Sequence, residues 1–193
     1  MTIRTYKERV SSLAKALPDK SDTEWLIAVY LSLGTAESLG YTRDSFARLD
    51  RNARDAVNAD MLSSDSFKIP ESSEAKRKWL AGHYFNNALF RMVALAEITL
   101  KTLFEREMNM KPPDNYWWLV DWYKKNFAKK LDFIGRARER VNKFKHVPRD
   151  RTRPMALDTY ADGLKAFEEL LVLMSFIVEA QHVAQPDASS GSR

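Results

Sequence analysis

The sequence predicts an all-α protein, and three observations lead to that class. The 193-residue chain has only six glycines and seven prolines, and they fall between its periodic segments rather than inside them. The segments themselves carry apolar residues at spacings of three and four, as amphipathic helices do. No stretch alternates apolar and polar residues over enough positions to predict a sheet, and no internal repeat is present. We therefore expect long helices joined in a single up-down bundle.

Residues 1–70 are expected to form a helical extension packed on this bundle. Pro18 and Gly40 would end its first two helices, and Ser21 with Glu24 has the spacing of a capping box at the start of the second. The predicted elements of the extension are, in order, helices at 3–17, 25–39 and 44–61 and a loop at 62–71.

The bundle is expected over residues 71–184, followed by a disordered tail at 185–193 that is small and polar. Pro148 would end one of its helices, because a proline disfavours helical geometry at the residue before it. The predicted bundle helices are 73–107, 116–126, 127–144 and 154–182. The first and last of these would be its longest members.

Composition limits the classes of function. The chain has no cysteine, which excludes disulfides, thiolate zinc sites and a cysteine nucleophile, and favours a reducing compartment such as the cytoplasm. Lysine and arginine outnumber aspartate and glutamate by 31 to 26, so the formal charge of +5 permits a polyanionic partner without requiring one.

The chain is also expected to be soluble and to make no membrane contact. Residues 1–10 lack the apolar stretch of a secretory signal. The longest apolar run, at 170–178, is about half of the ~20 residues that cross a bilayer. That run therefore indicates either a buried helix segment or a subunit interface.

One charged stretch, GRARERVNKFKH at 135–146, holds the residue types best suited to chemistry. Apolar residues at helical spacing mark its buried face: Ile134, Ala137, Val141 and Phe144. Polar residues flank this face on its two sides, with Arg136, Arg140 and Lys143 on one and Arg138, Asn142 and Lys145 on the other.

The end of this stretch can gather an arginine, an amide and an imidazole. Because Pro148 follows closely, the last turn can open and bring His146 back beside Arg140 or Asn142. Arginine can hold two phosphate oxygens in its planar fork, and histidine can move protons near neutral pH. The alternative is purely structural, since the helix dipole also favours basic residues in a last turn.

The pattern Arg140-x5-His146 within RVNKFKH resembles the Arg-x4-6-His signature of HEPN-domain proteins. Residues 83–104 resemble the first core helix of that family, and the resemblance covers roughly residues 73–183. The chain differs in one respect, because Val141 directly follows the arginine where the family often has a polar residue.

The resemblance implies a ribonuclease of HEPN type that needs no metal and no cofactor, acting as a toxin or as a defence or stress effector. A 2′-hydroxyl would attack the neighbouring phosphate while Arg140 stabilises charge on the phosphoryl oxygens. His146 would transfer the proton, with Asn142 as a further site residue. A homodimer would bring two copies of His146 to one cleft, and a regulatory protein partner would suit such an effector.

Three polar residues interrupt the apolar stripe of the longest predicted helix. Glu97 is expected to form an ion pair with Arg140 or Arg136, which would orient the motif, although a direct role in the site is compatible with this. For His83 and Asn86 we expect packing or an interhelix hydrogen bond, because buried polar groups require partners.

A short aromatic segment precedes the motif and offers contacts for RNA. Trp117 is the candidate for stacking unpaired bases, and Lys124 and Lys125 are candidates for holding phosphates. Aromatic residues at a spacing of four are more often core anchors, so Trp118 and Trp122 are expected to be buried.

The sequence contains no glycine-rich phosphate loop, HExxH motif, EF-hand pattern or serine nucleophile elbow, which excludes the common nucleotide, zinc, calcium and hydrolase sites. Two other hypotheses stay open beside the ribonuclease. The same basic helix end could bind RNA or a partner protein without cleavage, or the bundle could be an oligomerisation scaffold with residues 170–178 at its interface.

Overall fold

The computed structural model describes residues 2–42, 45, 73–145 and 159–183. Every regular element in these ranges is a helix, so the predicted all-α class is confirmed. A short 3-10 helix, η1 (Ile3–Tyr6), leads directly into α1. The α-helices are α1 (Lys7–Ala16), α2 (Lys20–Ser38), α4 (Ser73–Met108), α5 (Tyr116–Phe127), α6 (Asp132–Lys145) and α7 (Tyr160–Val183).

The start of α2 differs from the predicted capping box. The helix begins at Lys20, and the Asp19 carboxylate accepts a hydrogen bond of 2.7 Å from the backbone N–H of Ser21. An aspartate at this position satisfies one of the backbone donors that a helix leaves open in its first turn. Ser21 therefore lies inside the helix, and α2 begins five residues before the predicted position 25.

The break between α5 and α6 also differs from the prediction, which placed one helix directly after the other. Ala128 adopts a left-handed conformation, with φ of 52°, and its N–H donates to the Lys124 carbonyl at a distance of 3.1 Å. Such a residue ends a helix and redirects the chain. As a result α6 begins only at Asp132, after a short connection.

Three predicted segments lie outside the described residues. They are the loop at 62–71, the tail at 185–193 and, apart from Ser45, the helix at 44–61. The predicted helix at 154–182 corresponds to α7, which is described from Tyr160.

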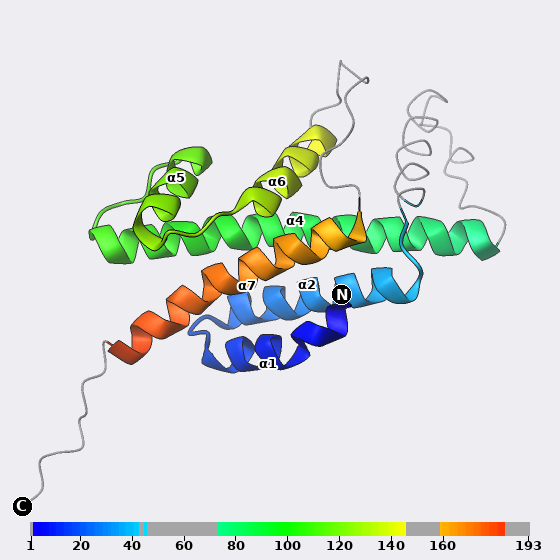
Figure 1. The fold of residues 1–193 in the computed structure, drawn as a ribbon, viewed down its shortest axis with the longest axis horizontal. Coiled ribbons are helices and arrows are strands. Elements are labelled where there is room, and N and C mark those ends of the chain that lie inside the picture. The colour runs from blue at the N-terminus through cyan, green and yellow to red at the C-terminus, as the bar shows by residue number, and fades with distance from the viewer. Residues whose placement is uncertain (1, 43–44, 46–72, 146–158, 184–193) are drawn as a thin grey trace, which may run out of the picture.

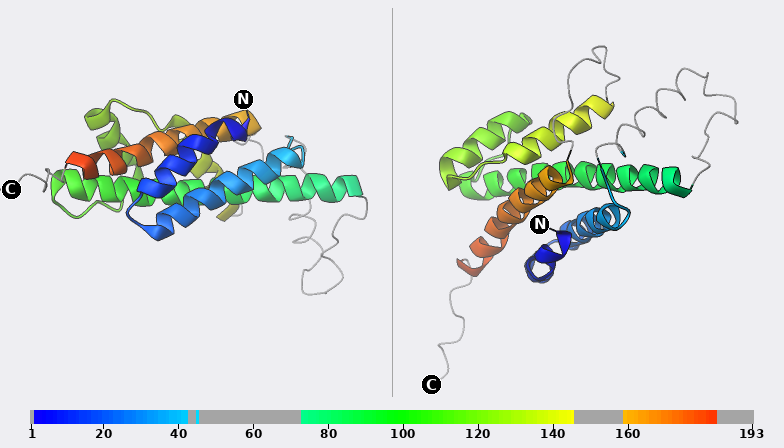
Figure 2. Two further views of the ribbon diagram at one scale, coloured as in Figure 1. Left: turned by 90° about the horizontal axis from the view of Figure 1, so that it is seen from below. Right: turned by 45° about the vertical axis from the view of Figure 1, so that its right-hand side comes forward.

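The helices are arranged around α4, which extends along the whole length of the molecule (Figure 1). α2 runs beside α4, and α7 crosses it at an angle. α1 packs on α2 and α7, whereas α6 packs on α4 and α7. A second view shows α5 and α6 on one side of α4 and the N-terminal helices on the other (Figure 2). The motif helix α6 thus packs against the two longest helices of the described structure, α4 and α7.

A single hydrophobic core includes the N-terminal helices together with the predicted bundle. Leu26 and Leu33 of α2 are fully buried, as are Leu95 and Leu100 of α4. These side chains belong to one continuous cluster with those of α6 and α7. The described part of residues 1–70 therefore contributes to the core on which the motif helix rests.

The apolar run at 170–178 is a buried helix segment. Leu170, Leu171 and Leu173 have no exposed surface, and Met174 is nearly as well covered. Their contacts lie within one chain, so most of this segment is not free to form the interface of a scaffold. No helix among the described residues is both long and apolar enough to cross a bilayer.

Tyr6 connects the N-terminus to α7 and provides a test of this packing by pH. Its hydroxyl donates to Oε2 of Glu168 at 3.4 Å, and its ring meets Phe167 edge to face. Burial, together with the Glu168 carboxylate, raises the pKa of Tyr6 to about 12. Because the folded pKa exceeds that of the unfolded chain, this contribution to stability is complete below about pH 10 and is lost as the pH rises through 12. In an ultraviolet titration, Tyr6→Phe should remove a tyrosine that ionises near pH 12. Loss of a tyrosine that ionises near the ordinary pH of about 10 would contradict the contact with Glu168.

Candidate functional site

The motif arginine Arg140 is buried inside the protein. It has no exposed surface, although it is a charged residue with a long side chain. Its guanidinium Nη2 lies 3.3 Å from Oδ1 of Asn86 and 3.4 Å from the hydroxyl of Tyr41, to which it donates. The guanidinium carbon also lies 5.3 Å from the centre of the Phe85 ring, in a cation–π contact. Arg140 therefore connects α6 to α4 and to the segment that follows α2.

The Arg140 pocket has an aromatic wall built from three separate elements. The rings of Tyr41 and Phe85 are stacked with their centres 4.1 Å apart, and Tyr160 at the start of α7 lies 6.0 Å from Phe85. Phe85 fits against α7 because residue 163 is a glycine: a Cβ atom there would lie 2.4 Å from the Phe85 ring. The pocket thus depends on α4, on α7 and on the segment that follows α2.

The other end of α6 is held by an acidic residue of α7. The Glu169 carboxylate accepts hydrogen bonds from the backbone N–H groups of Phe133 at 3.0 Å and Ile134 at 2.9 Å. It satisfies donors that the first turn of α6 would otherwise leave open. Burial raises the pKa of the Glu169 carboxyl above its usual value, and the two backbone bonds oppose that rise. The sequence signal for this residue is an acidic side chain close to the apolar run of α7.

The expected ion pair of Glu97 with Arg140 or Arg136 is not formed. The Glu97 carboxylate instead pairs with Lys101, one turn further along α4, at 3.0 Å. Arg136 stacks over the Phe133 ring of its own helix at 5.0 Å. Sequence spacing places these residues on facing helices, but Arg140 meets α4 at Asn86, three helical turns before Glu97.

The two other polar residues of the α4 stripe have different surroundings. Asn86 is buried and forms an interhelix hydrogen bond, as predicted. His83 is exposed, with its ring stacked on Trp79 at 5.6 Å. The stripe therefore lies at the edge of the core, because His83 and Asn86 lie within one helical turn and only Asn86 is buried.

Arg138 lies on the opposite flank of α6 and joins α6 to α5. Its guanidinium carbon is 4.3 Å from the centre of the Tyr116 ring. Burial raises the pKa of Tyr116, an effect that Arg138 opposes and that the carboxylates of Glu97 and Glu169 reinforce. The Glu97 carboxylate thus influences the ionisation of Tyr116, and its ion pair is with Lys101 rather than with the motif arginine.

The remaining motif residues are only partly within the described structure. Asn142 is half-buried on the same flank as Arg138. Lys143 and Lys145 belong to α6, but their side chains lie outside the described residues, as does His146. The structure thus brings Arg140 together with Asn86 and Tyr41, two partners that the sequence did not identify as its contacts.

More of the tryptophan side chains of α5 are exposed to solvent than predicted. Trp117 and Trp118 are 47% and 49% exposed, whereas Trp122 is buried. The prediction for Trp122 is confirmed, and that for Trp118 is wrong. The Trp118 ring packs edge-to-face on Phe104 of α4. Lys124 follows on the same exposed side of α5 as Trp117.

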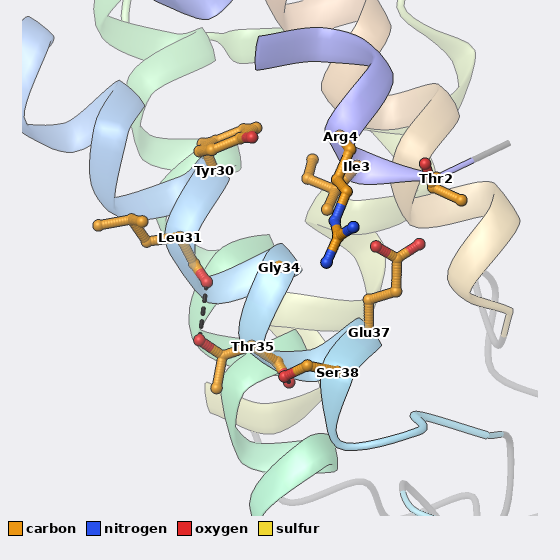
Figure 3. Close-up of a pocket in the computed structure, with 9 residues that line it drawn as sticks. All are labelled: Thr2, Ile3, Arg4, Tyr30, Leu31, Gly34, Thr35, Glu37 and Ser38. Carbon is orange, nitrogen blue, oxygen red and sulfur yellow. Dashed lines mark hydrogen bonds between the residues drawn. The ribbon is translucent and has the colours of Figure 1, made fainter.

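A separate pocket of about 580 Å³ lies between the N-terminus and α2 (Figure 3). The side chains of Arg4 and Glu37 point toward each other at one side of it, and Leu31 lies on another. None of the residues predicted for the site lines this pocket. Within the described ranges, no group of three or more histidine, aspartate or glutamate residues is arranged to hold a metal ion.

Comparisons of the chain with protein-family models, with curated proteins and with solved structures find no match. Polar contacts hold α6 at both ends, through Glu169 of α7 at its start and through Arg140 near its end.

Proposed function

We propose that the protein is a metal-independent endoribonuclease of HEPN type, acting at the C-terminal end of α6. The observation that supports this most directly is the anchoring of the motif helix by Arg140, whose buried guanidinium donates to Asn86 and Tyr41. Arg140 holds α6 near its C-terminal end, and proton transfer needs a fixed geometry, because a displacement of about 1 Å can cost a hundredfold in rate. A role as a toxin or a defence effector fits this activity.

In this proposal, His146 transfers protons and Arg140 is primarily a positioning residue. His146 directly follows Lys145, the last residue of α6. The 2′-hydroxyl of the RNA loses its proton and attacks the adjacent phosphorus, and the 5′-oxygen leaves as it is protonated. Asn142, half-buried one turn before the end of α6, can donate to a phosphoryl oxygen. A second copy of the chain would supply a second His146 as the partner acid or base.

A specific observation favours a second candidate, a helical module that binds RNA or a protein without cleaving. The Arg140 guanidinium has no exposed surface, so it does not reach a phosphate in this conformation. If no other group stabilises the phosphoryl charge, the same basic helix end would bind its ligand and leave it intact.

Cleavage of a labelled RNA by the purified full chain in EDTA tests the proposal. We expect strand scission that His146→Ala abolishes, because His146 is the histidine of the motif and histidine can transfer protons near neutral pH. The matched control is His83→Ala, which removes an exposed histidine of α4 and should leave the rate unchanged. Cleavage that survives His146→Ala would disprove the assignment, whereas binding without cleavage by the unaltered chain would favour the module.

A further inference from the structure

The outer side of α5 carries two indoles and several lysines on one exposed surface. We call this surface the α5 face, and its members are Trp117, Trp118, Asp121, Lys124 and Lys125. All five are exposed, while Tyr116, Leu119 and Tyr123 of the same helix turn inward. Two further exposed lysines, Lys129 and Lys130, continue the positive charge beyond the end of the helix. With one aspartate against two lysines, the α5 face has a net positive charge.

The two exposed indoles are held in place by their inner edges. A Cβ atom at residue 135 would lie 3.4 Å from the six-membered ring of Trp117, so this ring rests against Gly135 of α6. The Trp118 ring packs edge-on against Phe104 of α4, with centres 5.4 Å apart. About half of each side chain remains open to solvent. Each indole is thus immobilised on one side and free to stack on the other.

We propose that the α5 face binds an unpaired RNA strand, with bases stacked on Trp117 and Trp118 and phosphates held by Lys124 and Lys125. The proposal rests on the proposed ribonuclease function, to which it adds that the substrate is single-stranded where it meets α5. Each aromatic ring offers a surface to any base, and lysines one to two turns away follow the backbone of the strand. The lysine excess matches a polyanion better than a neutral protein surface.

The position of the α5 face relates it to the motif helix. Trp117 contacts α6 directly at Gly135, and the neighbouring Tyr116 lies beneath Arg138 of the same helix. A strand that leaves Trp117 along α6 runs toward the helix end that His146 follows. A duplex would present its phosphates to the lysines but would keep its base faces covered, so it would gain nothing from the two indoles.

The experiment measures binding of the full chain to labelled oligouridine by fluorescence anisotropy, with EDTA present and His146→Ala as the background to prevent cleavage. Trp117→Ala and Trp118→Ala are each expected to weaken binding about tenfold. Trp79→Ala is the matched control, because that tryptophan lies on α4 and stacks on His83. A duplex RNA should bind less tightly than oligouridine and should not distinguish the tryptophan variants from the control.

Salt dependence separates the lysines from the indoles. Replacing Lys124 and Lys125 by alanine should reduce the slope of log affinity against log salt by about 0.7 for each lysine. The control pair Lys7 and Lys15, exposed on α1, should leave the slope unchanged. An oligodeoxyuridine of equal length shows whether the strand must be RNA, and preference for it over oligouridine would contradict the proposed substrate.

The outcomes also distinguish this proposal from the ribonuclease proposal. Binding that depends on the tryptophans, without cleavage by the unaltered chain, would support the α5 face and contradict the catalytic function. Cleavage by the unaltered chain, with affinity unchanged in both tryptophan variants, would support the catalytic function and contradict the α5 face. Equal affinity for duplex and oligouridine, or no RNA binding at all, would overturn the α5 face as a single-strand site.

Discussion

Arg140→Ala is expected to lower the free energy of unfolding by about 3 kcal/mol. The substitution removes a fully buried side chain and leaves an empty volume beside the Phe85 ring. It also removes the donor to Asn86 and Tyr41, both of which stay buried. A lost donor next to buried acceptors costs more than the hydrogen bond itself contributes. Urea unfolding followed by circular dichroism would measure the change.

Arg136→Ala is the matched control for this prediction. It removes the same residue type from the same helix, one turn earlier, where the side chain is exposed. The Arg136 guanidinium stacks over the Phe133 ring of the same helix and is otherwise open to solvent, so the expected loss is less than about 1 kcal/mol. Equal effects of the two substitutions would show that Arg140 is not buried in solution. Because Arg140→Ala perturbs the fold, loss of RNA cleavage in that variant alone would not identify a catalytic role.

The helices could be predicted well from the sequence, and their ends less well. Periodicity and the prolines place α4 and α5 correctly, because these signals depend on neighbours along the chain. The start of α2 depends on a choice between two caps, Asp19 and Ser21, that differ little in intrinsic preference. The gap before α6 depends on a left-handed alanine, a conformation that its residue type does not indicate.

The surroundings of the motif could not be predicted, because they come from distant parts of the chain. Periodicity places Arg140 on a polar flank of its helix, yet the structure buries it completely. The partners that make burial tolerable are Asn86 and Tyr41, which lie 54 and 99 positions away in the sequence. Trp118 shows the opposite error: its spacing on α5 predicts burial, but it packs on Phe104 of α4 with about half of its surface exposed.

Gly163→Ala is expected to destabilise the protein by about 2 kcal/mol, although alanine favours helices more than glycine does. The new Cβ atom would lie 2.4 Å from one carbon of the Phe85 ring and 2.7 Å from another, too close for either to remain in place. The ring has little room to retreat, because Tyr41 is stacked 4.1 Å away and the Arg140 guanidinium carbon lies 5.3 Å away. The strain is therefore transmitted to the pocket of the motif arginine.

Gly34→Ala provides a control with the opposite sign. Gly34 also lies inside a helix, α2, but a Cβ atom there would meet only the Cγ2 atom of Ile3 at an ordinary distance of 3.7 Å. The helix preference of alanine then acts unopposed, and we expect a gain of about 0.5–1 kcal/mol. Thermal unfolding of the two variants measures both signs. Stabilisation by Gly163→Ala would mean that α7 does not press on Phe85, and that the Arg140 pocket is looser than its contacts indicate.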